Sequence, residues 1–442
     1  MRGVATCYPA AALRSTTYLV LIGLSATAWR CGRTSDVRPD PGEPPGVAQL
    51  QSPAPDAPPP PPPCVDDGWT TYGHDAARTS ASAGCLTAPL RQSWSFSPHW
   101  VRGTASHATR AIVAGDAVYV SGGIGPTPTL WRLDPATGAV VWTYVTMADA
   151  TRDGWPTLAG TKVMLVDDGV YSVDAATGKG HRGELDAWGE SLTDGERLFA
   201  ENDRYWDGYG LYVSAFDLDA HMLWRRDYDA LVRFFTAPDV GGVALDGDRL
   251  VHAAQHGALH STQVSAFEPI SGDRAWKADV SPQSSPSIAG GRVFEIERWR
   301  GEASDRLVAR AGADGMVAWS REVDGARGPA PLLAAGRVVV HARDGLLAFE
   351  QESGADAWSS PLSRTAQAVQ SATTMAAATG SGTLVVVSGG GLHVLALADG
   401  RETWTTRVAP HGRRVEGPVI AGGALYVVAD GVVLRFEGVT GE

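Results

Sequence analysis

Positive charge is scarce in this sequence, and that scarcity excludes one broad class of partner. Lys and Arg number 37 against 49 Asp and Glu, so the formal net charge is −12. Nucleic-acid binding requires clustered Lys and Arg that neutralise phosphates. We therefore expect no nucleic-acid partner.

Cysteine is also rare, with four residues, and no C-x-x-C-H haem-attachment motif is present. Cys64 and Cys85 lie on either side of the start of the region that we expect to fold. The export signal described next implies an oxidising compartment, which favours a Cys64–Cys85 disulfide. Two free thiols are the alternative.

The N-terminal apolar run, residues 18–24, is too short to span a bilayer. It follows two arginines and precedes an A-x-A cleavage site at residues 26–28, so residues 1–28 are predicted to be a secretory signal peptide. We expect export to the periplasm or cell envelope, or secretion. A lipidated Cys31 would instead give an outer-membrane-anchored lipoprotein with a membrane tether, although the residue before it is not small, as lipoprotein signals require.

Residues 29–63 are predicted to be a disordered, proline-rich linker. They end in six consecutive prolines, Pro58–Pro63. Such a run adopts polyproline II and spaces its ends rather than folding. A tether and a tail without a role both fit this composition. The folded domain is expected over residues 64–442.

A repeated motif organises this domain. An acidic residue is followed by a small residue and Gly, and Trp comes four positions after the Gly; the copies recur every 40 to 50 residues, as in propeller blades. Complete copies place Gly138 before Trp142, Gly272 before Trp276, Gly315 before Trp319, Gly354 before Trp358 and Gly400 before Trp404. Two copies are degenerate: His221 stands at the Gly position before Trp224, and Gly178 is followed by Arg182 in place of Trp.

The last copy is split between the two ends of the domain. Residues 436–442 supply the turn without a Trp, and Leu90–Trp94 supplies a Trp without the turn. We therefore predict an all-β fold, an eight-bladed β-propeller of four-stranded antiparallel blades, closed by an N-terminal strand around Leu90–Trp94 that completes the C-terminal blade. Closure removes exposed sheet edges. Residues 68–79 are expected to pack across the closing blade.

The Trp series is interpreted as structural. Each indole can lie across the turn of a neighbouring blade, where Gly, lacking a Cβ, allows a close approach, and each indole N–H needs an acceptor. The junction at Arg182 is expected to pack differently. The structural set is Trp94, Trp142, Trp224, Trp276, Trp319, Trp358 and Trp404.

Over residues 68–442 these motifs resemble the PQQ-like, quinoprotein-type propeller repeats. That family includes quinoprotein alcohol dehydrogenases, which bind PQQ on the propeller axis, and the non-catalytic BamB-like propeller lipoproteins of outer-membrane assembly. The dehydrogenases use a Ca²⁺ site, a carboxylate base and usually a disulfide between adjacent cysteines, and no matching local motif occurs here. We therefore assign no catalytic residue, no metal and no cofactor, PQQ being unsupported by the site residues.

Four connections between second and third strands are long, at residues 121–128, 201–210, 255–263 and 297–305, whereas the others are short Asp-Gly or Gly-rich hairpins. We expect them to form a raised lip on the face that also carries the blade-to-blade crossings. Tyr, Trp and Arg in such loops are typical of binding sites, and arginines at the mouth of the axis would attract an anionic ligand; alternatively, the aromatics cover their own blades. The candidate binding residues are Arg204, Tyr205, Trp206, Tyr209, His256, His260, Arg298, Trp299, Arg300, Arg152, Trp155, Arg327, Arg413 and Arg414.

Two polar stretches are set aside. Residues 201–207 contain oxygen donors without the spacing of a Ca²⁺ loop, and are interpreted as a solvated hairpin loop. His252, His256 and His260 recur every four residues, but on strand and loop this spacing does not indicate a metal site.

The sequence thus favours a monomeric, non-catalytic, exported propeller that binds a protein or peptide on its loop-rich face in the cell envelope. The alternatives are a PQQ-dependent oxidoreductase or PQQ-binding sensor, and a glycan- or surface-binding module.

Overall fold

The computed structural model describes residues 65, 68–98, 106–124, 127–146, 154–167, 169–183, 189–204, 210–227, 240–255, 262–298, 304–326, 329–362, 375–388, 390–409 and 415–439. All of them belong to one compact unit, residues 59–442. Within these ranges there is no helix of the length and apolarity that a membrane span requires. The predicted signal peptide, Cys31 and the proline run lie outside the described residues.

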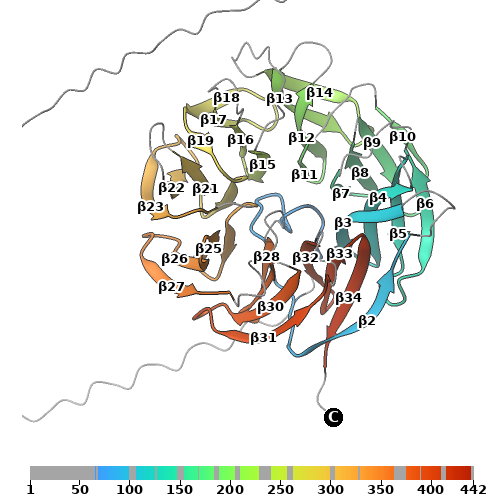
Figure 1. Ribbon diagram of the computed structural model, residues 1–442. Coiled ribbons are helices and arrows are strands. Elements are labelled where there is room, and N and C mark those ends of the chain that lie inside the picture. Colours follow the sequence, from blue (N-terminus) through green and yellow to red (C-terminus); the bar gives the residue numbers. More distant parts are fainter. Residues whose placement is uncertain are drawn as a thin grey trace, which may run out of the picture. The chain divides into compact units, whose positions relative to one another are not determined.

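Eight sheets built mainly of antiparallel neighbouring strands surround an axis, which confirms the predicted eight-bladed propeller (Figure 1). Each blade runs from an inner strand at the axis to an outer strand at the rim. Blades one and two consist of β3 (Ser106–Ala114), β4 (Ala117–Ile124), β5 (Thr127–Leu133), β6 (Val140–Val145), β7 (Pro156–Ala159), β8 (Lys162–Val166), β9 (Val170–Asp174) and β10 (Gly180–Arg182). Blades three and four consist of β11 (Ser191–Thr193), β12 (Arg197–Arg204), β13 (Gly210–Asp217), β14 (Met222–Asp227), β15 (Val240–Asp246), β16 (Arg249–Gln255), β17 (Gln263–Phe267) and β18 (Arg274–Ala278).

The remaining blades follow the same order. In blade five two short segments share the inner position and both pair with the second strand. Blades five and six consist of β19 (Ser281–Pro282), β20 (Ser287–Ala289), β21 (Arg292–Arg298), β22 (Asp305–Ala311), β23 (Val317–Val323), β24 (Leu332–Ala334), β25 (Arg337–Ala342), β26 (Gly345–Glu350) and β27 (Asp356–Ser360). Blades seven and eight consist of β28 (Met375–Thr379), β29 (Thr383–Ser388), β30 (Gly391–Ala396), β31 (Glu402–Arg407), β32 (Val415–Ala421), β33 (Ala424–Ala429) and β34 (Val432–Gly438).

The outer strand of blade eight comes from the start of the domain. β2 (Leu90–Phe96) pairs antiparallel with β34, with Leu90 opposite Gly438 and Phe96 opposite Val433. The predicted closure is confirmed: the two ends of the domain form one sheet.

Burial explains why the pattern of apolar and polar residues differs between the strands of a blade. The second strand of blade eight, β33, is buried along its whole length because it packs between two neighbouring blades. The outer strand β31 instead alternates between half-buried and exposed residues, because one of its faces meets solvent. The second strand of this blade therefore appears in the sequence as a continuous apolar run, and the outer strand β31 as a period-two pattern.

The Trp residues join neighbouring blades as predicted. Trp276 of blade four donates its indole N–H to the Gly312 carbonyl of blade five at 2.7 Å. Gly315 in that turn has a φ of +75°, and a Cβ there would lie 2.7 Å from the Trp276 ring. Five more indoles donate in the same way to the next blade: Trp94 to Pro135, Trp142 to Ala175, Trp224 to Pro269, Trp319 to Gln351 and Trp358 to Leu397. The turn that would receive Trp404 lies outside the described residues.

The junction between blades two and three is packed differently, as predicted, but through another residue. Each Trp-bearing outer strand has a register shift just before its Trp, and β10 has none. His181 rather than Arg182 therefore takes the Trp position, opposite Ser172. Its Nε2 lies 3.0 Å from the Asp219 carbonyl of blade three, so a small exposed hydrogen bond replaces the indole contact.

Several of the predicted lip loops are largely strand. In blade one the pairing continues to Ile124 opposite Thr127, so the expected loop at residues 121–128 is wrong: it is a tight hairpin. In blade three the pairing extends to Arg204 opposite Gly210, and in blade five to Arg298 opposite Asp305. These longer hairpins project from the same face on which the lip was expected.

Candidate functional site at the propeller axis

Residues 69–84, here called the axial strap, lie at the centre of the ring (Figure 1). The innermost strand of each blade is a sheet edge, and its axis-facing N–H and C=O groups need partners. The strap provides them for blades one to seven, in chain order. The expectation that this segment packs across the closing blade was wrong.

The strap contacts begin at blade one, where Trp69 and Val113 exchange backbone hydrogen bonds, and at blade two, where the Leu158 N–H donates to the Thr70 carbonyl at 2.8 Å. The strap ends as β1 (Ala81–Ser82), which pairs parallel with β28 of blade seven. In blade three the Ser191 carbonyl accepts a hydrogen bond from Thr71 Oγ1 at 3.2 Å. In each of blades four to seven one inner-strand N–H donates to a strap carbonyl: Leu245 to Ala76 at 2.7 Å, Ile288 to Ala77 at 2.8 Å, Leu333 to Thr79 at 2.9 Å and Ala378 to Ser80 at 2.9 Å.

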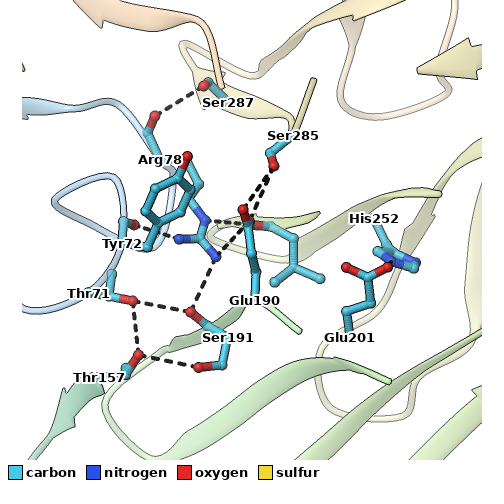
Figure 2. A network of polar contacts seen from close by, with 11 residues as sticks. Thr71, Tyr72, Arg78, Thr157, Glu190, Ser191, Glu201, His252, Ser285 and Ser287 are labelled. Carbon is cyan, nitrogen blue, oxygen red and sulfur yellow. Dashed lines mark hydrogen bonds and ion pairs between the residues drawn. The ribbon is translucent and has the colours of Figure 1, made fainter. Parts of the chain in front are cut away.

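Arg78 fixes the strap to blades three and four. Its side chain is fully buried, and a buried charge requires partners. The guanidinium donates to the carbonyls of Val243 at 2.7 Å, Tyr72 at 2.6 Å and Ser191 at 3.2 Å, and Nη2 lies 3.5 Å from Glu190 Oε2 (Figure 2). Burial lowers the pKa of Arg78, while the Glu190 carboxylate opposes that change.

Two further acid contacts lie on the blade-three side of the axis. Glu190 accepts a hydrogen bond from Ser285 Oγ at 3.2 Å. Glu201, on β12, is buried and places Oε1 3.5 Å from Nε2 of the fully buried His252 (Figure 2). Interpreting Glu201 as part of a solvated loop was therefore wrong. Burial, together with the nearby Glu201 carboxylate, raises the pKa of Glu190 to about 7, although Arg78 opposes this shift.

This raised pKa predicts a pH-dependent stability. In the unfolded chain Glu190 titrates near 4.5, so between pH 4.5 and 7 the folded state binds the extra proton and stability falls as pH rises. The loss amounts to at most about 3 kcal/mol. Glu190→Gln is expected to reduce this decline, measured by urea unfolding at pH 5, 6, 7 and 8. Equal pH profiles for the two proteins would show that Glu190 is not the titrating group.

Aromatic rings and cations stack beside this network. The Tyr72 ring lies 4.5 Å from the Trp155 ring, with Arg78 4.6 Å above Tyr72 and Arg110 4.5 Å from Trp155. Arg110 also pairs with Glu416 at 2.6 Å. Such cation–π contacts are strongest when desolvated. Trp155, a predicted binding residue, packs against Tyr72 and is 7% exposed, and its remaining surface borders the cavity described next.

An open cavity of about 670 Å³ lies on the axis above the strap. Strap residues Trp69, Tyr72, Gly73 and Ser80 form its floor, and the walls come mainly from blades five to eight. The described wall residues are Trp155, Ile296, Pro329, Ala330, Pro331, Leu332, Val339, Val340, His341, Leu346, Ala376, Gly417, Pro418 and Val419.

The cavity borders the face that carries the extended hairpins. Its wall includes Ala376, near the start of inner strand β28, and His341 and Leu346, which flank the β25–β26 turn. The starts of inner strands and the turns between second and third strands lie on one face of a propeller blade. The lip predicted from sequence and the axial cavity therefore share a face.

The predicted binding residues are only partly placed. Arg298 lies at the end of β21, where Nη2 pairs with the buried Asp305 at 2.7 Å, so it closes its own hairpin. Arg204 is placed as the last residue of β12. The other predicted binding residues lie outside the described residues and stay predictions: Tyr205, Trp206, Tyr209, His256, His260, Trp299, Arg300, Arg152, Arg327, Arg413 and Arg414. Cys64 also lies outside them, so the predicted disulfide between Cys64 and Cys85 stays a prediction.

The described residues of the axis include no preformed charged site for a PQQ–Ca²⁺ pair. PQQ carries carboxylates, yet no Lys, Arg, Asp or Glu is among the described cavity-lining residues. Acids near the axis already have partners: Glu190 lies beside Arg78, Glu201 beside His252 and Glu416 beside Arg110. Across the described ranges, no group of three or more His, Cys, Asp or Glu residues could hold a metal ion.

Sequence reasoning missed the strap, Arg78, Glu190 and His341. One signal was available for the first two. Residues 68–79 bring Trp, Tyr, His and Arg together in a stretch without a counterpart in any repeat, and a unique segment in a repetitive ring must occupy a unique place. His341 lies in an ordinary strand pattern and gives no signal.

Comparisons with known proteins agree with this architecture. The family model described as outer membrane protein assembly factor BamB matches residues 84–200 and 260–442. No curated protein matches the sequence. BamB from Moraxella catarrhalis is similar in structure, with 14% identity, a TM-score of 0.54 and coverage of 79% of this chain and 99% of that one.

Dehydrogenases share the fold as well. The quinohemoprotein alcohol dehydrogenase of Comamonas testosteroni is 15% identical, with a TM-score of 0.59 and coverage of 85% of this chain and 82% of that one. At such identities these structures establish the fold alone. The family match spans well over half of the sequence, so this chain belongs to the PQQ-like propeller family described as outer membrane protein assembly factor BamB.

Proposed function

We propose that this chain is a non-catalytic, exported scaffold of the cell envelope that binds a protein or peptide partner on its loop-rich face. The observation that carries the proposal is the asymmetry of that face. Strands β12 and β13 have eight residues each, whereas β8 and β9 of blade two have five each. Blade three therefore extends beyond blade two on the face that also carries the axial cavity.

A rigid ring with projecting hairpins suits recognition because loops on a fixed scaffold carry binding residues at little ordering cost. The indole contacts and the strap fix the blades, and the hairpins of blades three and five project from them. The Arg298–Asp305 pair holds the base of one such connection. The family description as an outer-membrane assembly factor supports a protein partner and an envelope location. Lipid attachment at Cys31 remains part of the proposal, and mass spectrometry of the mature N-terminus tests it.

Shortening the blade-three hairpin tests the binding face. Because Arg204 and Gly210 are paired, residues 205–209 can be replaced by Asn-Gly, which closes a two-residue hairpin without disturbing the ring. Chemical crosslinking in envelope extract followed by mass spectrometry is expected to recover the partner at least about 10-fold less efficiently with this variant, since hot-spot side chains dominate interfaces.

The control removes apolar side chains from the opposite face. Ile270 and Met316 are 77% and 68% exposed, so Ile270→Ser and Met316→Ser should leave capture unchanged. Equal capture by the shortened hairpin and the wild type would contradict the proposed binding face. Tight uptake of PQQ with Ca²⁺ in an absorbance titration would instead favour the oxidoreductase.

A further inference from the structure

We propose that the axial cavity binds a small uncharged molecule, made mainly of apolar rings and carrying a hydrogen-bonding group. This site is separate from the hairpins proposed to hold a protein partner, so either proposal can fail alone. The cavity is open, and its empty volume of about 670 Å³ includes the solvent at its mouth. Concave, mainly apolar sites of this kind are where small molecules bind.

The apolar character of the cavity comes from its walls. Blade six supplies Pro331, Leu332, Val340 and Leu346, and blade eight supplies Val419. Such a surface gains free energy by removing apolar ligand area from water. A ligand built of rings fits best, since flat rigid groups lose little conformational freedom on binding.

The charges near the cavity already have partners. Arg78 is saturated by three carbonyls and Glu190, while Arg110 pairs with Glu416. No ionic side chain is left among the described lining residues to compensate a charged ligand. Burying an uncompensated charge is costly, so the described lining favours a neutral ligand.

Polar side chains also border the cavity, and one of them, His341, is placed to anchor a ligand. His341 is half-buried and forms no hydrogen bond with any other described residue. Burial lowers its pKa, so the imidazole is neutral at pH 7, with one nitrogen that donates and one that accepts. A single donor or acceptor on the ligand would satisfy it.

The floor of the cavity is formed before any ligand arrives. Trp69 exchanges two backbone hydrogen bonds with Val113, and its ring packs edge-on against His74 at 5.0 Å. Tyr72 is held between Arg78 and Trp155. Preorganisation of this kind improves affinity because no side chain has to be ordered on binding.

The test uses two fluorescent probes that differ by one charge. N-Phenyl-1-naphthylamine is uncharged, has apolar rings and one N–H, and 8-anilinonaphthalene-1-sulfonate adds a sulfonate to the same rings. The neutral probe is expected to bind at one saturable site, and the sulfonate at least about 10-fold more weakly. Equal affinities, or no saturable binding of the neutral probe, would overturn the proposal.

Variants then locate the site. Ala330→Phe, or Ala376→Phe on another wall should the first fail to fold, fills the cavity and is expected to abolish saturable uptake of the neutral probe. His341→Phe keeps the volume but removes the polar anchor, and should weaken binding about 2- to 10-fold. Ala136→Phe on the exposed turn of blade one is the matched control and should change nothing. Uptake that survives in a folded cavity-filled variant would place the probe elsewhere and refute the assignment.

Discussion

Replacing Trp276 with alanine is expected to lower the free energy of unfolding by about 3–5 kcal/mol. The side chain is 8% exposed, its ring lies against Gly315, and its N–H donates to the Gly312 carbonyl at 2.7 Å. The substitution leaves a void between blades four and five and removes the donor from a buried carbonyl. Equilibrium urea unfolding followed by far-UV circular dichroism measures the change.

The junction that lacks a Trp provides the control. His181→Ala removes one exposed hydrogen bond between blades two and three, which is worth at most about 1 kcal/mol. A Trp276→Ala variant no less stable than His181→Ala would show that the indole contacts do not hold the blades together.

The sequence was sufficient for the fold because its strongest signals are local and repeated. Each Trp is four residues from its turn Gly, and the copies share one geometry, so blade number and closure follow from the spacing. The half-motif at Leu90–Trp94 and its complement near Phe436 predicted the β2–β34 pairing. The same spacing did not show that β10 lacks the register shift, which is why Arg182 was chosen over His181.

The axial contacts could not be predicted in the same way because they join residues far apart in sequence. Arg78 meets Glu190 across more than a hundred positions, and Glu201 meets His252 on the neighbouring blade. A polar stretch such as residues 201–204 has the same composition whether it faces water or a buried partner. Only the packing of adjacent blades decides between the two.

The strap and β2 belong to one continuous segment, residues 69–96, and together they join the whole ring. The strap supplies hydrogen-bond partners to the inner strands of blades one to seven, and β2 supplies the outer strand of blade eight. The propeller is thus closed at its rim by the β2–β34 pair and is also held together at its axis by the strap. Folding of the ring is therefore expected to be cooperative with docking of this N-terminal segment.

Arg78→Ala is expected to release that segment and to lower the free energy of unfolding by about 3–5 kcal/mol. The substitution removes donors to three buried carbonyls and leaves the Glu190 carboxylate without its cation. Arg78→Lys keeps the charge but not the planar set of donors, and should recover only part of the loss. Arg343→Ala is the matched control, because that arginine and its partner Asp324 are both 67% exposed, and a surface pair contributes at most about 1 kcal/mol.

A second measurement separates loss of the strap from general destabilisation. The amides of Leu245, Ile288 and Leu333 donate to strap carbonyls, so hydrogen exchange at these positions should accelerate in Arg78→Ala more than exchange at the amides of β33, which pair within blade eight. Trp276→Ala should instead accelerate exchange around blades four and five. If Arg78→Ala leaves the three strap-bonded amides as protected as in the wild type, Arg78 does not hold the strap, and the floor of the cavity is fixed by its backbone hydrogen bonds alone.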